Sequence, residues 1–181
     1  MMARRLFLLV FTAALVAAFG CSSGTDPVVF RCSDGGVAGA NAVNLSCGGA
    51  TAGTTEQVDV VLGGPASGST TLRGLNFDLA YAPSKLEFVP SGSYTSPLFP
   101  GALIAVTLFD GQPGRVVVSI QQTGGSPDVA VGAGEHTVLS LSFRRVSGIK
   151  FNPTPVALEN AEATSASAII TFASSLALSY Q

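Results

Sequence analysis

The chain has 181 residues, a formal net charge of −2 and 11% charged residues against 47% hydrophobic ones. That length suits one domain with a sizeable core and a short tether. Without a basic cluster the composition gives no support for nucleic-acid binding, and three cysteines with one histidine offer few ligands for zinc.

The N-terminus has the features of a secretory signal. Arg4 and Arg5 precede an apolar run over residues 6–19, shorter than the roughly 20 residues that a membrane-spanning helix needs. The stretch that ends in Gly20 and Cys21 resembles a bacterial lipoprotein signal, in which cleavage falls before a cysteine that carries lipid. Residues 1–20 are therefore predicted to be removed on export.

The resemblance implies that Cys21 is the lipidation site and that Ser22, which follows it, favours the outer membrane. Residues 21–41 would then be a tether and the start of a disulfide loop. The alternative is an ordinary secretory signal that is cleaved elsewhere and leaves Cys21 as a plain thiol. Loss of the signal removes two of the nine basic residues, so 7 basic residues remain against 11 acidic ones.

Two cysteines remain if Cys21 carries lipid. In an oxidising compartment the even pair Cys32 and Cys47 predicts a disulfide that closes a loop of about fifteen residues. A metal site is the competing interpretation, but no second cysteine pair is present and only His136 could complete it. Two free thiols are the remaining alternative.

From residue 42 onward, apolar residues alternate with polar ones between turns rich in glycine and proline, which is the period of half-buried strands. About eight or nine such strands in one domain predict an all-β, two-sheet β-sandwich over residues 42–181. The alternating apolar positions, in chain order, are Val58, Val60 and Leu62; Leu75, Phe77, Leu79 and Tyr81; Leu86 and Phe88; Ile104, Val106 and Leu108; Val116, Val118 and Ile120; Leu139, Leu141 and Phe143; Val156 and Leu158, in a short segment; and Ile170, Phe172, Leu176, Leu178 and Tyr180, in a final strand.

The order of these segments is similar to that of the cohesin domain, a jelly-roll module of bacterial cell-surface assemblies. Residues 74–83 (Gly-Leu-Asn-Phe-Asp-Leu-Ala-Tyr-Ala-Pro) resemble the family's third strand and the Tyr-Asp-Pro turn after it, with Ala82 in place of the aspartate. The fourth, sixth, seventh and ninth strands match residues 85–88, 115–120, 139–143 and 169–180. The resemblance implies a jelly roll, and a generic immunoglobulin-like sandwich is the alternative.

A cohesin recognises its dockerin, a small calcium-loaded helical module, through a face that includes its third, fifth and sixth strands. The resemblance implies that the matching face of this chain binds a protein partner, and that any calcium belongs to the partner. Asn76 falls near the position where scaffold cohesins often carry a partner-binding aspartate. Alternatively, this face is only the solvated side of a sheet. Its outward positions would be Asn76, Asp78, Ala80, Thr107, Ser119 and Gln121.

No pattern of catalytic residues stands out. His136 is the only possible histidine base, and it is expected to be a solvated residue at the start of a strand. The carboxylates Asp59, Asp78 and Glu87 alternate with apolar residues and are expected to face solvent. Asp110 and Gly111 lack the alternating ligands of a calcium loop and predict a turn. We therefore expect no enzyme, no cofactor and no metal site.

Carbohydrate binding is the main rival to protein binding, because related jelly-roll modules stack sugars on exposed aromatic rings. This chain has no tryptophan and three tyrosines. Tyr81 and Tyr180 share the parity of the core positions, so both are expected to be core or half-buried. Tyr94 and Phe99 lie on a loop rich in serine and proline, where they could be exposed; we expect them instead to pack over the edge of the sandwich.

The sequence thus predicts a lipid-anchored, exported binding module of the bacterial envelope, with a protein partner that is dockerin-like or another envelope protein. The anchor would lie in the outer membrane, facing the periplasm or the cell surface. A carbohydrate-binding module of the same architecture is the first alternative. A structural envelope lipoprotein without a discrete ligand is the second.

Overall fold

The computed structural model describes residues 30–33, 39–50, 55–164, 171–172 and 175–180. The predicted signal over residues 1–20 and the predicted lipidation site Cys21 lie outside these ranges. The described residues form thirteen β-strands. Among them there is no helix with the length and apolar character needed to span a membrane. The all-β prediction is confirmed.

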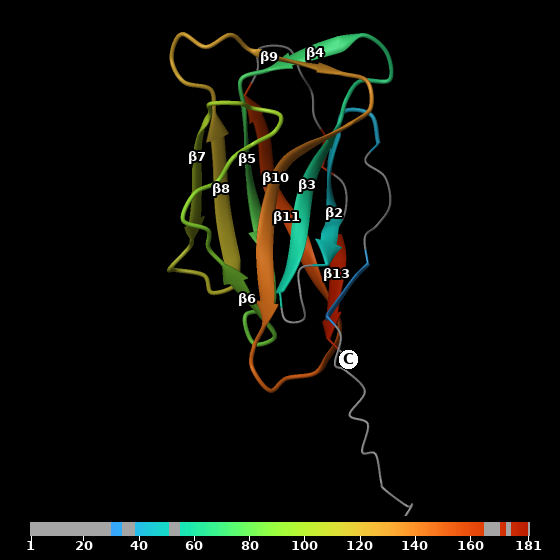
Figure 1. The fold of residues 1–181 in the computed structure, drawn as a ribbon, viewed down its shortest axis with the longest axis vertical. Coiled ribbons are helices and arrows are strands. Elements are labelled where there is room, and N and C mark those ends of the chain that lie inside the picture. Colours follow the sequence, from blue (N-terminus) through green and yellow to red (C-terminus); the bar gives the residue numbers. More distant parts are fainter. Residues whose placement is uncertain (1–29, 34–38, 51–54, 165–170, 173–174, 181) are drawn as a thin grey trace, which may run out of the picture.

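Two large sheets lie face to face, and a two-stranded sheet closes one end, at the top of Figure 1. The six-stranded sheet has the order β1 (Phe30–Ser33), β13 (Ser175–Tyr180), β11 (Phe151–Thr164), β5 (Gly74–Ala80), β8 (Arg115–Gln121) and β7 (Leu103–Leu108). The five-stranded sheet has the order β12 (Thr171–Phe172), β2 (Ala42–Ala50), β3 (Thr55–Gly63), β10 (Glu135–Arg145) and β6 (Leu86–Val89). The short sheet pairs β4 (Ser69–Leu72) with β9 (Val129–Gly132).

The core lies between the two large sheets and is built from the alternating positions that the sequence indicates. Successive strand residues point to opposite faces, so every second apolar side chain turns inward. Phe143 on β10 is fully buried, and its ring meets Tyr81 and Phe88 edge-on at centroid distances of 5.3 and 5.7 Å. The inward residues of the central strands are all at most 2% exposed: Leu75, Phe77 and Leu79; Val116, Val118 and Ile120; Val58, Val60 and Leu62; Leu139, Leu141 and Phe143.

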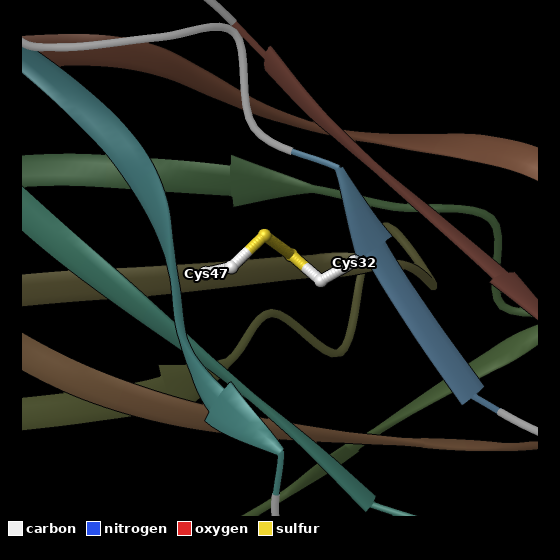
Figure 2. The surroundings of a disulfide bond; sticks show 2 residues. All are labelled: Cys32 and Cys47. Carbon is white, nitrogen blue, oxygen red and sulfur yellow. A yellow bond between two sulfur atoms is a disulfide. The ribbon is translucent and has the colours of Figure 1, made fainter.

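A disulfide joins the two sheets. Cys32 on β1 belongs to the six-stranded sheet and Cys47 on β2 to the five-stranded one, and their sulfur atoms are bonded (Figure 2). The Cα atoms are 5.8 Å apart across a sequence separation of 15 residues. The predicted pairing of these two cysteines is confirmed. Because β1 lies within residues 21–41, part of the predicted tether region belongs to the sandwich.

The C-terminal region differs from the prediction in two ways. The single final strand expected over residues 169–180 is wrong, because β12 pairs with β2 in one sheet and β13 pairs with β1 and β11 in the other. The short segment around Val156 and Leu158 is instead the 14-residue strand β11. Two irregularities interrupt its register, and two prolines lie within it, so its alternation is broken in the sequence.

Candidate partner-binding face

Four neighbouring strands, β11, β5, β8 and β7, form one broad outer surface of the six-stranded sheet. Antiparallel register places residues in rows across these strands, and directly opposed side chains share a face. Three rows contain the residues that the sequence indicates as the partner-binding face. These rows are Glu162, Asn76, Ser119 and Ala105; Glu159, Asp78, Val117 and Thr107; and Thr164, Gly74, Gln121 and Leu103. A fourth row holds Ala157, Ala80 and Arg115. We call this surface the outer face.

The register therefore places Asn76, Asp78, Thr107, Ser119 and Gln121 on one continuous surface, together with Ala80. At its centre the Ser119 hydroxyl donates a 2.7 Å hydrogen bond to the side-chain oxygen of Asn76. Ser119 is exposed and Asn76 is half-buried. Their role in binding stays a prediction, but their shared placement is a property of the fold.

A charged cluster lies beside this pair. The Arg115 guanidinium donates to Asp78 at 3.2 Å and to the carboxylate of Glu159, which comes from the neighbouring strand β11. The Asn160 side-chain amide donates a second bond to the same Asp78 oxygen at 2.8 Å. Only 13% of the Asp78 side chain is exposed, so the expectation that this carboxylate faces solvent is wrong. Arg115 and Asn160 cover it.

A β-bulge brings Asn160 to this position. The register between β11 and β5 shifts between Glu159 and Glu162, so extra residues of β11 face a shorter stretch of β5. Asn160 has a φ of 48°, in the left-handed region that asparagine tolerates better than most residues. The bulge thereby directs the side-chain amide of Asn160 toward Asp78 on the neighbouring strand β5.

Sequence reasoning missed three members of this cluster. Arg115 could have been found, because it precedes the inward Val116 and so has outward parity. Glu159 and Asn160 could not, because the bulge changes which residues of β11 oppose β5. Their approach to Asp78 depends on pairing between segments about eighty residues apart.

The opposite margin of the outer face is apolar. The exposed large hydrophobic side chains of the described residues are Leu103, Leu108 and Phe109, with exposed fractions of 68%, 44% and 50%. Leu103 and Phe109 have the outward parity of the outer face, with exposed Ala105 and Thr107 between them. Leu108 lies opposite the inward Val116, so it has inward parity and is exposed at the sheet edge. The outer face is therefore graded, from carboxylates on β11 to aliphatic and aromatic groups at β7.

Gly74 allows the strands of this face to approach closely. A Cβ built on it would lie 2.2 Å from the Ile120 carbonyl oxygen and 2.9 Å from the side-chain oxygen of Gln121. Gln121 therefore lies against the Gly74 backbone and is half-buried. Of the five residues predicted for the face, Thr107 and Ser119 are the exposed ones.

The remaining candidates form no second site within the described residues. His136 is half-buried, and its ring nitrogen lies 3.0 Å from the Gly132 carbonyl oxygen. Glu87 is exposed and paired with Arg144 at 2.6 and 2.8 Å, and this hydrogen-bonded pairing lowers the pKa of Glu87. Asp59 is half-buried and accepts a 2.9 Å hydrogen bond from the side chain of Gln57, so its expected exposure is only partial.

Two further expectations concern loops and metal ligands. Asp110 and Gly111 lie in the turn between β7 and β8, as predicted. Throughout the described ranges, no group of three or more His, Cys, Asp or Glu side chains is placed to hold a metal ion.

Tyr81, Tyr94 and Phe99 do not form an exposed platform, and Phe109 is the large exposed aromatic ring among the described residues. Phe99 is 1% exposed and Tyr81 is half-buried against the core. Tyr94 also packs against the core, and its hydroxyl accepts a 2.8 Å hydrogen bond from the Ser91 backbone N–H. The expected packing of Tyr94 and Phe99 over the sandwich is confirmed. The side chain of Tyr180 lies outside the described residues.

The same arrangement of strands occurs in solved structures. The sixth cohesin of scaffoldin B from Acetivibrio cellulolyticus, in complex with a mutant Cel5 dockerin, superposes with a TM-score of 0.57 at 14% identity. The match covers 74% of this chain and 93% of that one. The protein has a cohesin-like fold. The structure therefore confirms the jelly-roll sandwich that the sequence resemblance implies.

Two more solved structures match with lower TM-scores. A type II cohesin domain from the Acetivibrio cellulolyticus cellulosome is 13% identical, covering 76% of this chain and 92% of its own, with a TM-score of 0.49. A cohesin module from a Clostridium perfringens family 33 glycoside hydrolase is 10% identical over 85% of this chain and 93% of that one, with a TM-score of 0.48. No protein-family model and no curated protein matches the sequence.

Proposed function

We propose that this cohesin-like protein is a binding module of the bacterial envelope, held by lipid on Cys21, that binds a protein partner on its outer face without catalysis. The outer face is the observation that carries this proposal. It combines a rigid, ion-paired polar centre with an exposed apolar margin on adjacent strands. Protein interfaces use the same combination of apolar contact area and a few oriented hydrogen bonds.

The cluster around Asp78 supports binding by keeping the polar centre ordered. Arg115 and Asn160 hold Asp78 from two sides, so a partner meets groups that are already fixed in place. Preorganised side chains lose less conformational entropy when a partner binds. Glu159 and Glu162 add negative charge on the β11 side, which favours a partner with basic groups there.

The dockerin bound to the similar Acetivibrio cohesin makes a dockerin-like partner the first one to test. The described residues support the carbohydrate alternative less well, because Phe99 is buried, Tyr81 and Tyr94 pack against the core, and Phe109 alone among them presents a large exposed ring. Sugar-binding surfaces of this kind need planar rings open to solvent.

A pull-down from envelope extract, with and without calcium, tests the proposal and identifies the partner by mass spectrometry. The decisive comparison is then the affinity of the purified partner for two variants. Ser119→Arg places a bulky cation at the centre of the outer face, and we expect a loss of at least tenfold, about 1.4 kcal/mol. Ser140→Arg is the matched control, since Ser140 is also an exposed serine and lies on β10 of the other sheet.

Equal affinity of both variants would show that the partner binds elsewhere. The anchor has its own measurement, which is mass spectrometry of the protein extracted from membranes. We expect the mass of a diacyl or triacyl modification on Cys21. An unmodified Cys21 thiol would remove the lipid from the proposal while leaving the binding face in place.

A further inference from the structure

The six-stranded sheet ends at β7, whose far edge is open among the described residues (left margin of Figure 1). The Phe109 N–H bonds to the Arg115 carbonyl at 3.0 Å, so Phe109 and Arg115 form a hydrogen-bonded pair. In an antiparallel ladder such pairs recur at every second residue. On β7 the hydrogen-bonded residues are therefore Leu103, Ala105, Thr107 and Phe109. The N–H and C=O groups of the alternate residues, Ile104, Val106 and Leu108, point away from β8 to the open edge.

This edge lacks the devices that usually block pairing with another strand. Natural edge strands are protected by charges, prolines, bulges or short length. Residues 103–109 contain no charged residue and no proline, and the pairing of β7 with β8 is regular. The other edges of the two large sheets differ: β6 carries exposed Glu87, β1 carries exposed Arg31, and β12 has two residues.

The open edge is also complementary to itself. About a two-fold axis through Val106, antiparallel pairing sets Val106 opposite its own copy and Ile104 opposite Leu108. All three residues direct their backbone groups to the edge, so every open N–H and C=O of both strands finds a partner. On the outer face, Leu103 lies opposite Phe109, which brings the 68%-exposed leucine side chain against the 50%-exposed ring. No like charges meet, because the strand is uncharged.

From this we infer that two copies of the protein pair through β7, antiparallel about Val106, into one continuous sheet. A register centred on Ala105 would set Phe109 opposite Gly101 and Leu108 opposite Ala102, and would leave both large side chains uncovered. A charged or bulky foreign strand would not match an uncharged edge with this symmetry. A second copy has the same uncharged, self-complementary β7 edge. Pairing about the two-fold axis uses this edge of both copies, so the assembly closes as a dimer.

The dimer places the two outer faces side by side and leaves their polar centres open, while Leu103 and Phe109 of the apolar margin are covered where the two copies meet. It does not depend on the proposed binding function, because two copies would associate through the β7 edge without any partner. Pairing through one strand buries less area than a standard interface, so we expect association in the micromolar to millimolar range rather than a permanent dimer. A partner with two binding modules would gain avidity from it.

Sedimentation equilibrium of the whole protein over that concentration range, without any partner, tests the association. We expect a reversible monomer–dimer equilibrium that Leu103→Lys weakens at least tenfold, since it sets a charge opposite Phe109. Thr71→Lys on exposed β4 is the control. Both variants keep the same N-terminus, so association through a lipid anchor would be equal in both. A monomer at every concentration, or equal association of the two variants, would overturn the inference.

Cysteine cross-linking tests the register. In Val106→Cys the new cysteine meets its own copy with Cα atoms about 5.5 Å apart, a separation that a disulfide can bridge. In Ala105→Cys it meets Thr107 instead and lies too far from its copy. We expect mild oxidation to give a covalent dimer with Val106→Cys and only the background of the parent with Ala105→Cys. The reverse result, or equal cross-linking, would reject the register centred on Val106.

Discussion

The outer surfaces of the two large sheets have similar sequence patterns but different chemistry. On the five-stranded sheet, outward Ser140 and Asp59 lie opposite each other, and exposed Glu87 and Arg144 pair at the edge. On the six-stranded sheet, Asp78 is mostly covered by Arg115 and Asn160, and an apolar margin follows at β7. Outward parity alone therefore does not identify a binding surface. A preorganised polar centre beside uncovered apolar side chains distinguishes one face from the other.

The disulfide offers the largest expected change in stability and leaves the difference between the faces intact. Replacing Cys32 and Cys47 with serine should lower the free energy of unfolding by about 3 kcal/mol, as expected for a loop of this size. The bond lies at the β1 side of the six-stranded sheet, away from β8 and β7. Urea unfolding measures the loss, and affinity for the identified partner should stay within about twofold of the parent. A strong loss of affinity would mean that the outer face depends on the disulfide.

A direct comparison of the faces comes from their two arginines. Arg115→Ala should destabilise the protein by about 1–3 kcal/mol, because it leaves the 13%-exposed Asp78 carboxylate without its cation. Arg144→Ala is the matched change on the other sheet. Arg144 and Glu87 are each about half exposed, so water replaces their interaction and we expect no measurable change. Urea unfolding of both variants is the test, and equal losses would contradict the distinction drawn between the faces.

The smallest expected effect depends on pH and concerns Glu56, on the core side of β3. This residue is 4% exposed, and burial raises the pKa of its carboxyl above the usual 4.5. Since the folded pKa is the higher one, the protonated form is favoured in the fold. Its stabilising contribution is present below the unfolded pKa and is lost as pH rises through the folded pKa.

Glu56→Gln should therefore make the protein more stable than the parent near neutral pH, and the difference should shrink toward pH values of about 4. Urea unfolding at both pH values measures this. Glu87→Gln is the control from an exposed position, where paired Arg144 lowers the pKa instead. A Glu56→Gln variant that is less stable at neutral pH would show that the carboxylate is stabilised by interactions that outweigh its burial.

Local alternation was enough to predict much of the fold. Leu75, Phe77 and Leu79 point inward because strand side chains alternate, and the same rule gives Asn76 and Asp78 their outward direction. The pairing of Cys32 with Cys47 also followed from their number and compartment. The prediction of a single final strand was wrong because β12 and β13 share one parity but belong to different sheets. Parity contains no information about which strand is the partner.

The sequence by itself determined the inward parity of the central strand residues and that the chain forms a β-sandwich, because period-two alternation is a local property of the chain. Only the tertiary structure decided which strands are neighbours. It brought Glu159 and Asn160 to Asp78 through a bulge in β11, and it left β7 at the edge of its sheet. Both outcomes depend on register between segments far apart in the chain, which backbone pairing and core packing settle together.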